Sequence, residues 1–185
     1  MKHLILASGS PRRKEILEQV GLDFCVLPSD VEEIITKQVP SDIVMELSKQ
    51  KAEDVWEKLD DKKHIVLGAD TVVAYDGKIL GKPKDVEDAK AMLRMLSGEK
   101  HSVYTGVTLV SENGLETFFE ETLVEFYEMT EEEINVYVAT GEPMDKAGAY
   151  GIQGKAAAFI KGIEGDYYNV VGLPIAKTLK FLQKM

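Results

Sequence analysis

The chain has 185 residues, of which 44% are hydrophobic and 29% are charged, a composition typical of a folded globular protein. Its 32 acidic residues outnumber its 22 basic ones, and the net charge of −10 argues against broad binding to nucleic acids or anionic membranes. Cys25 is the single cysteine, which excludes an intrachain disulfide. With an N-terminal apolar run too short for a signal peptide, this favours a cytoplasmic location.

Strands and helices are predicted to alternate along the first half of the chain. Pro11 after Ser10 is typical of a helix start, and Gly21 of a helix end. The apolar residues between Ile43 and Leu59 recur with the period of a helix, for which Ser41 is a candidate N-cap. The predicted elements are a strand at 3–7, a helix from Pro11 to Gly21, a strand at 23–28, a helix after Ser41 and a strand at 64–75.

The second half contains two predicted hairpins, with turns at Asp76-Gly77 and at 112–114. Thr130 and Glu133 have the spacing of a capping box. The other predicted elements are a helix at 85–96 capped by Asp85, strands at 101–110 and 116–126, a helix at 130–139, a strand at 158–163 and a helix from Pro174 to about Gln183. Without repeats or a clear linker, the pattern predicts one α/β domain over 1–185 with a mixed sheet.

The turn between the first strand and the first helix has the composition of an anion site. It contains Ser8, Gly9 and Ser10, and Arg12 and Arg13 follow at the helix start, where the helix dipole disfavours cations. Backbone N–H groups at a helix start and guanidinium groups bind phosphate well. The alternative is a capped surface helix with two solvated arginines.

Asp70 interrupts an otherwise apolar strand in the stretch VLGADTVV. A carboxylate there is costly to bury unless it is paired or bound to a metal, and strand ends in α/β sheets commonly carry functional sites. The alternative is an aspartate that caps a local turn.

Two further stretches can approach a ligand. Lys82 lies in an extended Gly-Lys-Pro segment, and Gln153 lies among small residues within 142–160, where its amide can both donate and accept hydrogen bonds. The alternatives are a solvated turn lysine and a flexible surface loop. The roles of Lys51 in the second helix and of the Glu32-Glu33 pair are left open by the sequence. The histidines lack the spacing of a zinc protease, and the serines lack the G-x-S-x-G motif of a hydrolase.

Taken in order, these stretches resemble the Maf family of nucleoside triphosphate pyrophosphatases. The matching stretches lie between residues 6 and 174 and are ASGSPRRKEIL, the Glu32-Glu33 pair, LSKQKA, LGADT, GKP, the helix end at 92–98, EPMDKAGAYGIQGKAAAFI and GDYYNVVGLP. Each stretch alone is weak, but the combination is highly specific. The pattern Arg13, Thr71 and Gln153 is similar to that of the branch that acts on dTTP and UTP.

The resemblance implies a mixed twisted sheet with flanking helices, in two lobes around a central cleft, similar to inosine triphosphate pyrophosphatases. The implied reaction converts a nucleoside triphosphate and water to the monophosphate and pyrophosphate with a divalent cation, Mg²⁺ or Mn²⁺, as cofactor. Such an enzyme removes non-canonical or excess nucleotides. The family is also linked to arrest of septum formation, and a homodimer is expected.

The resemblance also implies a role for each matching residue. Asp70 is the general base or the metal-bound residue that orients water, and Glu33 helps to hold the cation. Gln153 pairs with the pyrimidine, and Arg13 and Thr71 complete the selection. The residues expected to bind the triphosphate are Ser8, Arg12, Lys51 and Lys82.

Three other functions are alternatives to this one. A nucleotide-binding cell-division regulator without turnover would gain little from Asp70, because a carboxylate faces an anionic ligand unfavourably. A phosphotransferase or nucleotidyltransferase would need a pocket for a second substrate, which the sequence does not reveal. Nucleic-acid binding is disfavoured by the charge of −10.

Overall fold

The computed structural model describes residues 3–185, so the first two residues of the predicted domain 1–185 lie outside the described part. The chain forms two compact units. The first unit combines the N-terminal segment up to Thr71 with Thr105–Glu120 and Gly172–Met185. The second unit combines Val72–Tyr104 with Glu121–Val171.

The strands form a mixed sheet in the order β2-β1-β3-β5-β6-β7, with β4 paired to β3. Strand β1 is parallel to β2 and β3, whereas the β3–β4 and β6–β7 pairs are antiparallel. The mixed α/β class predicted from the sequence is therefore confirmed. The strands are β1 (Leu4–Leu6), β2 (Phe24–Val26), β3 (Ile65–Tyr75), β4 (Lys78–Leu80), β5 (Lys100–Ser111), β6 (Gly114–Phe126) and β7 (Ile160–Glu164).

Helices flank this sheet, and three short 3-10 turns follow helix α4. The helices are α1 (Pro11–Gln19), α2 (Pro40–Lys58), α3 (Val86–Leu96), α4 (Glu131–Ala139), α5 (Tyr167–Val171) and α6 (Ile175–Leu182). The 3-10 turns are η1 (Glu142–Asp145), η2 (Ala147–Ala149) and η3 (Lys155–Ala158). Within residues 3–185, no helix is both long and apolar enough to cross a membrane.

Of the five predicted helix starts, those of α1, α3 and α4 are confirmed, that of α6 lies one residue later, at Ile175 after Pro174, and the one at Ser41 is wrong. Helix α1 begins at Pro11 after Ser10, the Asp85 carboxylate accepts the N–H of Asp88, and the capping box of α4 is present. Helix α2, however, begins one residue before Ser41. Pro40 takes the first helical position, since its fixed φ and missing N–H suit that place, and Ser41 lies inside the first turn.

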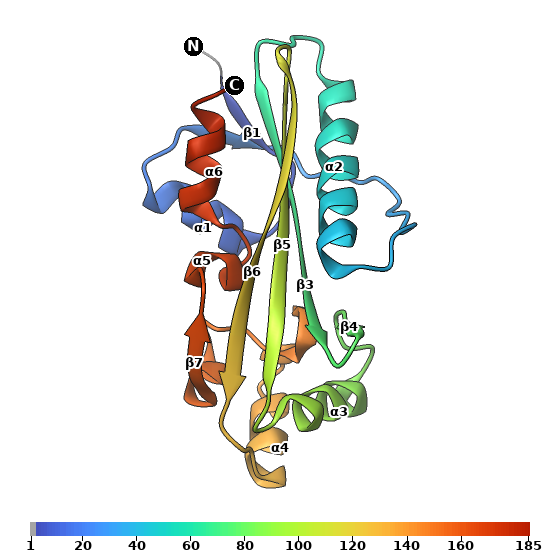
Figure 1. Cartoon of the computed structure of the whole chain (residues 1–185), viewed down its shortest axis with the longest axis vertical. Coiled ribbons are helices and arrows are strands. Elements are labelled where there is room, and N and C mark those ends of the chain that lie inside the picture. The colour runs from blue at the N-terminus through green and yellow to red at the C-terminus, as the bar shows by residue number, and fades with distance from the viewer. Residues whose placement is uncertain (1–2) are drawn as a thin grey trace. The chain divides into compact units, whose positions relative to one another are not determined.

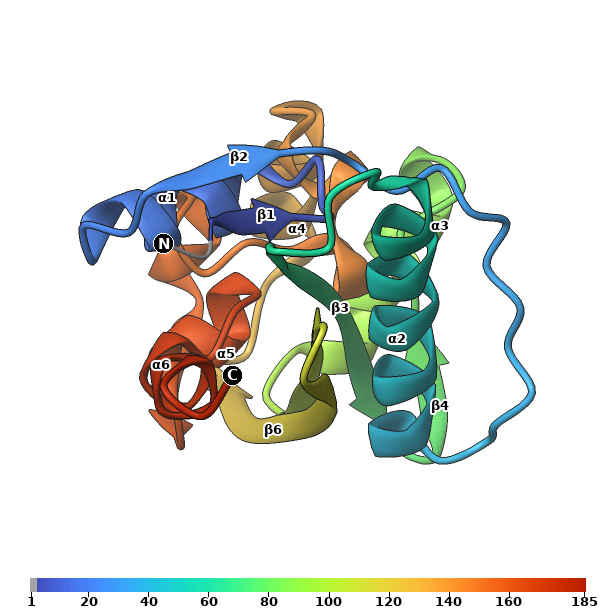
Figure 2. The same ribbon diagram turned by 90° about the horizontal axis from the view of Figure 1, so that it is seen from above.

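In the first unit, α2 covers one face of the sheet, and α1 and α6 lie on the other side (Figures 1 and 2). Helix α2 and strand β3 meet at Gly68, where a Cβ atom would lie 2.3 Å from the carbonyl oxygen of Ser48. Glycine therefore sets the distance between helix and strand. A core cluster here consists of apolar residues from α2, β3, β5, and from β1 and the residue after it, namely Ile5, Ala7, Ala52, Val55, Val66 and Val110.

The second unit has a core of its own, built from β3–β6, α3, α4 and the 3-10 turns. The hairpin predicted at Asp76-Gly77 is confirmed, with φ of 47° and 70° at these residues, as a tight two-residue turn requires. The strand predicted at 158–163 begins at Ile160, because Lys155–Ala158 forms the turn η3. The small-residue segment 142–160, which carries Gln153, is largely 3-10 structure.

Candidate active site

The turn between β1 and α1 is organised by the Ser8 side chain, which is buried. Its hydroxyl oxygen accepts a hydrogen bond from the N–H of Ser10 at 3.3 Å and another from Nη1 of Arg13 at 2.9 Å. The turn is thereby fixed in front of the helix start, where unpaired backbone N–H groups favour an anion.

Arg13 points inward from the first turn of α1. Its Nε donates to the Gly172 carbonyl at 2.8 Å and its Nη2 to the Thr71 hydroxyl at 3.1 Å, while Thr71 contacts Thr105 at 2.8 Å. Burial lowers the pKa of Arg13 from its ordinary value, and the charge of Asp70 partly opposes that effect. The guanidinium group thus joins the turn, β3 and the chain segment after α5.

The three cations at the start of α1 have different environments. Arg13 is buried among hydrogen-bond acceptors, Arg12 is half-buried, and Lys14 is exposed and lies 3.6 Å from Glu18. A ligand anion is therefore not needed to explain Arg13, since carbonyl, hydroxyl and carboxylate oxygens in the fold already offset its charge. Among these cations, the half-buried Arg12 is better placed than Arg13 to meet a ligand.

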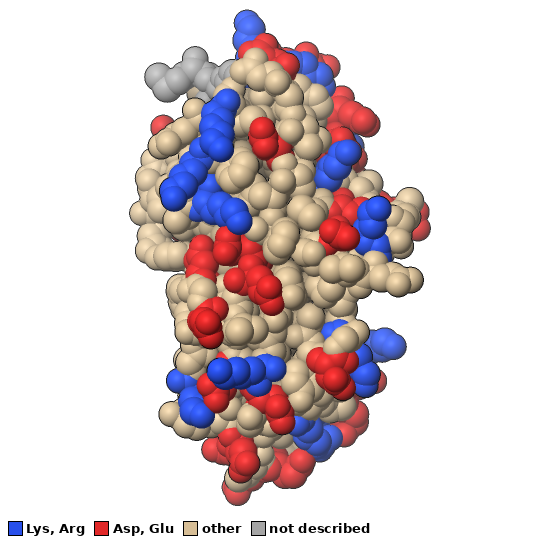
Figure 3. All heavy atoms as spheres, viewed as in Figure 1, with Lys and Arg blue, Asp and Glu red and all other residues tan. Residues whose placement is uncertain are grey.

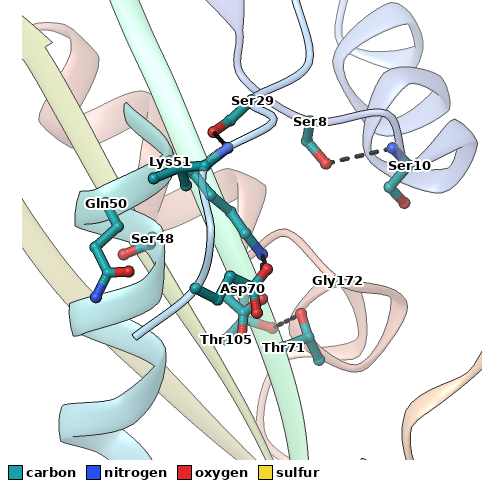
Figure 4. Close-up of polar contacts among 12 residues, drawn as sticks. Ser8, Ser10, Ser29, Ser48, Gln50, Lys51, Asp70, Thr71, Thr105 and Gly172 are labelled. Carbon is teal, nitrogen blue, oxygen red and sulfur yellow. Dashed lines mark hydrogen bonds and ion pairs between the residues drawn. The ribbon is translucent and has the colours of Figure 1, made fainter. Parts of the chain in front are cut away.

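Asp70, Lys51 and Glu33 form a second cluster, termed here the Lys51 cluster. Nζ of Lys51 lies 2.5 Å from Oδ1 of Asp70 and 2.8 Å from Oε1 of Glu33. Figure 4 shows the lysine reaching from α2 towards Asp70 on β3. The side chain of Glu33 is 45% exposed, against 14% for Asp70. The cluster is therefore open to solvent on the side of Glu33.

The Lys51 cluster fits a divalent cation only with help from a ligand. Its two carboxylates supply the oxygen atoms that Mg²⁺ prefers. Within residues 3–185, however, no group of three or more His, Cys, Asp or Glu side chains converges as a metal site. Oxygen atoms of a bound ligand and of water would have to complete the coordination, since Mg²⁺ is commonly held by only one or two carboxylates.

Comparisons with known proteins identify the family of the chain. The model of the Maf-like protein family matches residues 3–185. The chain belongs to the Maf-like protein family. Similar relatives include proteins named dTTP/UTP pyrophosphatase from Agathobacter rectalis, 55% identical over 100% of this chain and 98% of that protein, and from Bacillus cytotoxicus, 58% identical over 100% and 96%. The resemblance inferred from the motifs is therefore confirmed.

A solved structure shares the fold of this Maf-like protein at low sequence identity. The Staphylococcus aureus Ham1 protein aligns over 84% of this chain and 90% of its own, with a TM-score of 0.50 and 15% identity. At that identity the likeness concerns the arrangement of the elements alone.

The two remaining predicted site residues of this Maf-like protein, Lys82 and Gln153, belong to the second unit and are both exposed. Lys82 follows Gly81, whose carbonyl accepts the N–H of Gly148 in η2 at 3.1 Å. The Gly-Lys-Pro segment is thus hydrogen-bonded to the small-residue segment that carries Gln153.

Sequence reasoning missed three residues that organise the site of this Maf-like protein. Thr105 and Gly172 contact Thr71 and Arg13 through the fold alone, and no local pattern marks them. Gln50 is different, because Glu46, Gln50 and Asp54 recur at intervals of four residues, which places them on one face of α2. That spacing was a usable signal for a polar contact along the helix.

Proposed function

We propose that this protein hydrolyses dTTP and UTP to the nucleoside monophosphate and pyrophosphate, and so clears nucleotides from the cellular pool. The observation that carries the proposal is the Lys51–Asp70 contact of 2.5 Å, which brings a carboxylate and an ammonium group together beside the interior of α2, where Glu33 also contacts Lys51. Relatives at 55–58% identity that are named dTTP/UTP pyrophosphatase support the choice of reaction.

In the proposed mechanism, Asp70 accepts a proton from a water molecule that attacks the α-phosphorus. A bond forms between the water oxygen and the α-phosphorus, and the bond to the α–β bridging oxygen breaks, so that pyrophosphate leaves. Lys51 donates a hydrogen bond to Asp70 and fixes the orientation of its carboxylate. A positioned base of this kind typically contributes a factor of about 10²–10⁴ to the rate.

The triphosphate is bound, in this proposal, by the turn after β1 and by positive side chains. The buried hydroxyl of Ser8 and the N–H groups at the start of α1 support this assignment. Arg12, Lys51 and Lys82 contribute positive charge that offsets the charge developing on the leaving pyrophosphate.

Glu33 and Asp70 would hold a divalent cation, Mg²⁺ or Mn²⁺, that arrives with the nucleotide. When bound, such an ion neutralises phosphate charge and polarises the phosphorus–oxygen bonds. Both carboxylates lie within 2.8 Å of one atom, Nζ of Lys51, and this closeness to one another supports the donor pair.

Gln153 would select the pyrimidine, since its amide can accept from N3–H and donate to an adjacent carbonyl of uracil or thymine. Its exposed position supports access to a ligand. Arg13 and Thr71 would complete the selection indirectly, because Arg13 is buried and holds the Thr71 hydroxyl in place.

The proposal also places the protein in the cytoplasm, as a homodimer that does not bind nucleic acids. The net charge of −10 supports the last point, and acidic and basic side chains are interspersed on the face shown in Figure 3. Membership of the family supports the dimer, which light scattering of the purified protein tests directly. A single cysteine and a nucleotide substrate support the location.

The test is to incubate the protein with UTP or dTTP and Mg²⁺ in ¹⁸O-labelled water and to identify the products by mass spectrometry. The proposal requires monophosphate that carries the label, unlabelled pyrophosphate, and no reaction after chelation of the metal. Label in pyrophosphate would place attack at the β-phosphorus, and orthophosphate with a diphosphate would place it at the γ-phosphorus. Nucleotide binding without products would favour the regulator, and reaction only with an added acceptor would favour a transferase.

A further inference from the structure

The segment Ser29–Thr36, termed here the strap, runs from the end of β2 towards α2 and carries Glu33. The blue trace in Figure 2 shows the long connection that contains it beside α2. Most strap residues are exposed, including Ile34 and Ile35 at 62% and 56%. The apolar core therefore does little to hold the strap, and its position depends on polar contacts.

Three residues on one face of α2 hold the strap at three points. The Asp54 carboxylate accepts the Ser29 hydroxyl at 2.7 Å, and the Glu46 carboxylate accepts the N–H of Thr36 at 2.9 Å. Between them, Gln50 accepts the N–H of Ile34 at 3.0 Å and donates its Nε2 to the Ile34 carbonyl at 2.7 Å. The Gln50 side chain therefore binds both the N–H and the carbonyl group of Ile34.

Gln50 and Lys51 are consecutive in α2 and bind consecutive residues of the strap. Gln50 holds the backbone of Ile34, and Lys51 holds the side chain of Glu33 at 2.8 Å. Because Glu33 is 45% exposed, its carboxylate would lose conformational entropy on each encounter with the Lys51 cluster if the strap were mobile. The amide of Gln50 removes that freedom in advance.

We propose that Gln50 is a positioning residue that presents the Glu33 carboxylate to the Lys51 cluster, and thereby sets how tightly the divalent cation is held. The assignment to the cation rests on the proposed function. The contact between Gln50 and the strap is independent of the proposed function. The contact and the role at the cation can therefore be tested separately.

The first arm measures amide hydrogen exchange in the metal-free protein. Replacement of Gln50 by Ala should speed exchange of the peptide spanning the strap by about 10-fold, with no change in peptides from α6. The matched control is Lys49→Ala, which removes the neighbouring exposed side chain that pairs with Glu53 at 3.7 Å and should leave the strap unchanged. Unchanged strap exchange in Gln50→Ala would overturn the proposal whatever the protein's activity.

The second arm measures dTTP hydrolysis against Mg²⁺ concentration in wild type, Gln50→Ala, Glu33→Gln and the double variant. Gln50→Ala should lower kcat/KM about 10-fold at limiting Mg²⁺, and excess Mg²⁺ should recover most of the loss. It should add no further loss in the Glu33→Gln background, because the carboxylate that it positions is already absent. Equal losses in both backgrounds would show that Gln50 acts on the fold in general, and the proposal would be wrong. A wild-type protein that does not hydrolyse dTTP or UTP would overturn the proposed function and the role at the cation, while hydrogen exchange would still decide whether Gln50 holds the strap.

Discussion

Asp70 on β3 and Lys51 on α2 form an ion pair with 2.5 Å between Oδ1 and Nζ, and the two side chains are only 14% and 17% exposed. Loss of Lys51 would leave the largely buried Asp70 carboxylate without its ion-pair partner, whereas loss of the Asp70 charge leaves Lys51 paired with Glu33 at 2.8 Å. The pair also holds a carboxylate in one orientation in a site that a ligand can reach through the more exposed Glu33.

Replacement of Asp70 by Asn should keep the fold and lower turnover of UTP about 10²–10⁴-fold, since the amide cannot accept the proton of the attacking water. Steady-state kinetics and thermal unfolding of the same preparation check both halves of the expectation. Asp23→Asn makes the same chemical change at an exposed position and is the control. Near-wild-type turnover in folded Asp70→Asn would remove Asp70 from the proposed mechanism.

Replacement of Gln153 by Ala should reduce the differences in kcat/KM between nucleotides with different bases. A polar contact in a desolvated site is worth on the order of 1–3 kcal/mol, so kcat/KM for UTP and dTTP should fall roughly 5- to 150-fold. The kcat/KM values for CTP and GTP should fall by a smaller factor. Arg12→Ala is the comparison, because a phosphate contact should affect all four nucleotides about equally. A single common factor for the four nucleotides in Gln153→Ala would instead make Gln153 structural.

Replacement of Gly68 by Ala should destabilise the protein by about 1–3 kcal/mol or more. The added Cβ would lie 2.3 Å from the Ser48 carbonyl oxygen and 2.8 Å from the backbone nitrogen of Ala52, so α2 must move away from β3. Gly162→Ala is the control in another strand, since nothing lies within 4 Å of its added Cβ. Urea unfolding compares the two, and equal stability would show that α2 adjusts without strain.

His101 makes the second unit sensitive to acid. The ring is 2% exposed, its Nε2 lies 2.7 Å from the Tyr150 hydroxyl, and its buried Nδ1 has no hydrogen-bond partner among the described residues. It also packs edge-on against Phe126 at 5.0 Å. Burial lowers the pKa of His101 from 6.5 to about 4.

Because the folded pKa is the lower one, the unfolded chain binds a proton first as the pH falls. The contribution of His101 to stability is therefore present above about pH 6.5 and is lost towards pH 4, with a loss of about 2 kcal/mol between pH 7 and pH 5. Urea unfolding of His101→Gln should show a pH dependence weaker by that amount. The exposed His3→Gln should behave as wild type, and an unchanged dependence in His101→Gln would contradict the expectation.

Local patterns were enough to predict most of the fold. Periodicity and caps identified α1, α3, α4 and both hairpins, because the residues that stabilise these elements lie close together in the sequence. Ser41 failed as a cap because Pro40 competes for the helix start. Helix α5 and the 3-10 turns were missed, since they are short and are held by contacts such as that between Asn169 and the carbonyl of Val103 at 2.9 Å.

The sequence was enough to predict which residues belong to the candidate site, but not which of them contact one another. Asp70 was marked by its charge within an apolar strand, and its partner Lys51 was one of several helical lysines that looked alike. The inward turn of Arg13 could not be predicted, because the Gly172 carbonyl that accepts from it belongs to a distant part of the chain. Roles that depend on a ligand stay predictions.

The hydrogen bond from Arg13 to Gly172 joins residues 159 positions apart, and the first unit is assembled from three separate pieces of chain. During synthesis, the carbonyl that accepts from the buried guanidinium of Arg13 is made 159 residues after Arg13 itself. The contacts that complete the turn after β1 therefore form only once Gly172 has been made, and the piece Gly172–Met185 closes the first unit. A chain truncated before Gly172 would lack the carbonyl to which Nε of Arg13 donates, so we expect the buried position of this guanidinium to be lost with it.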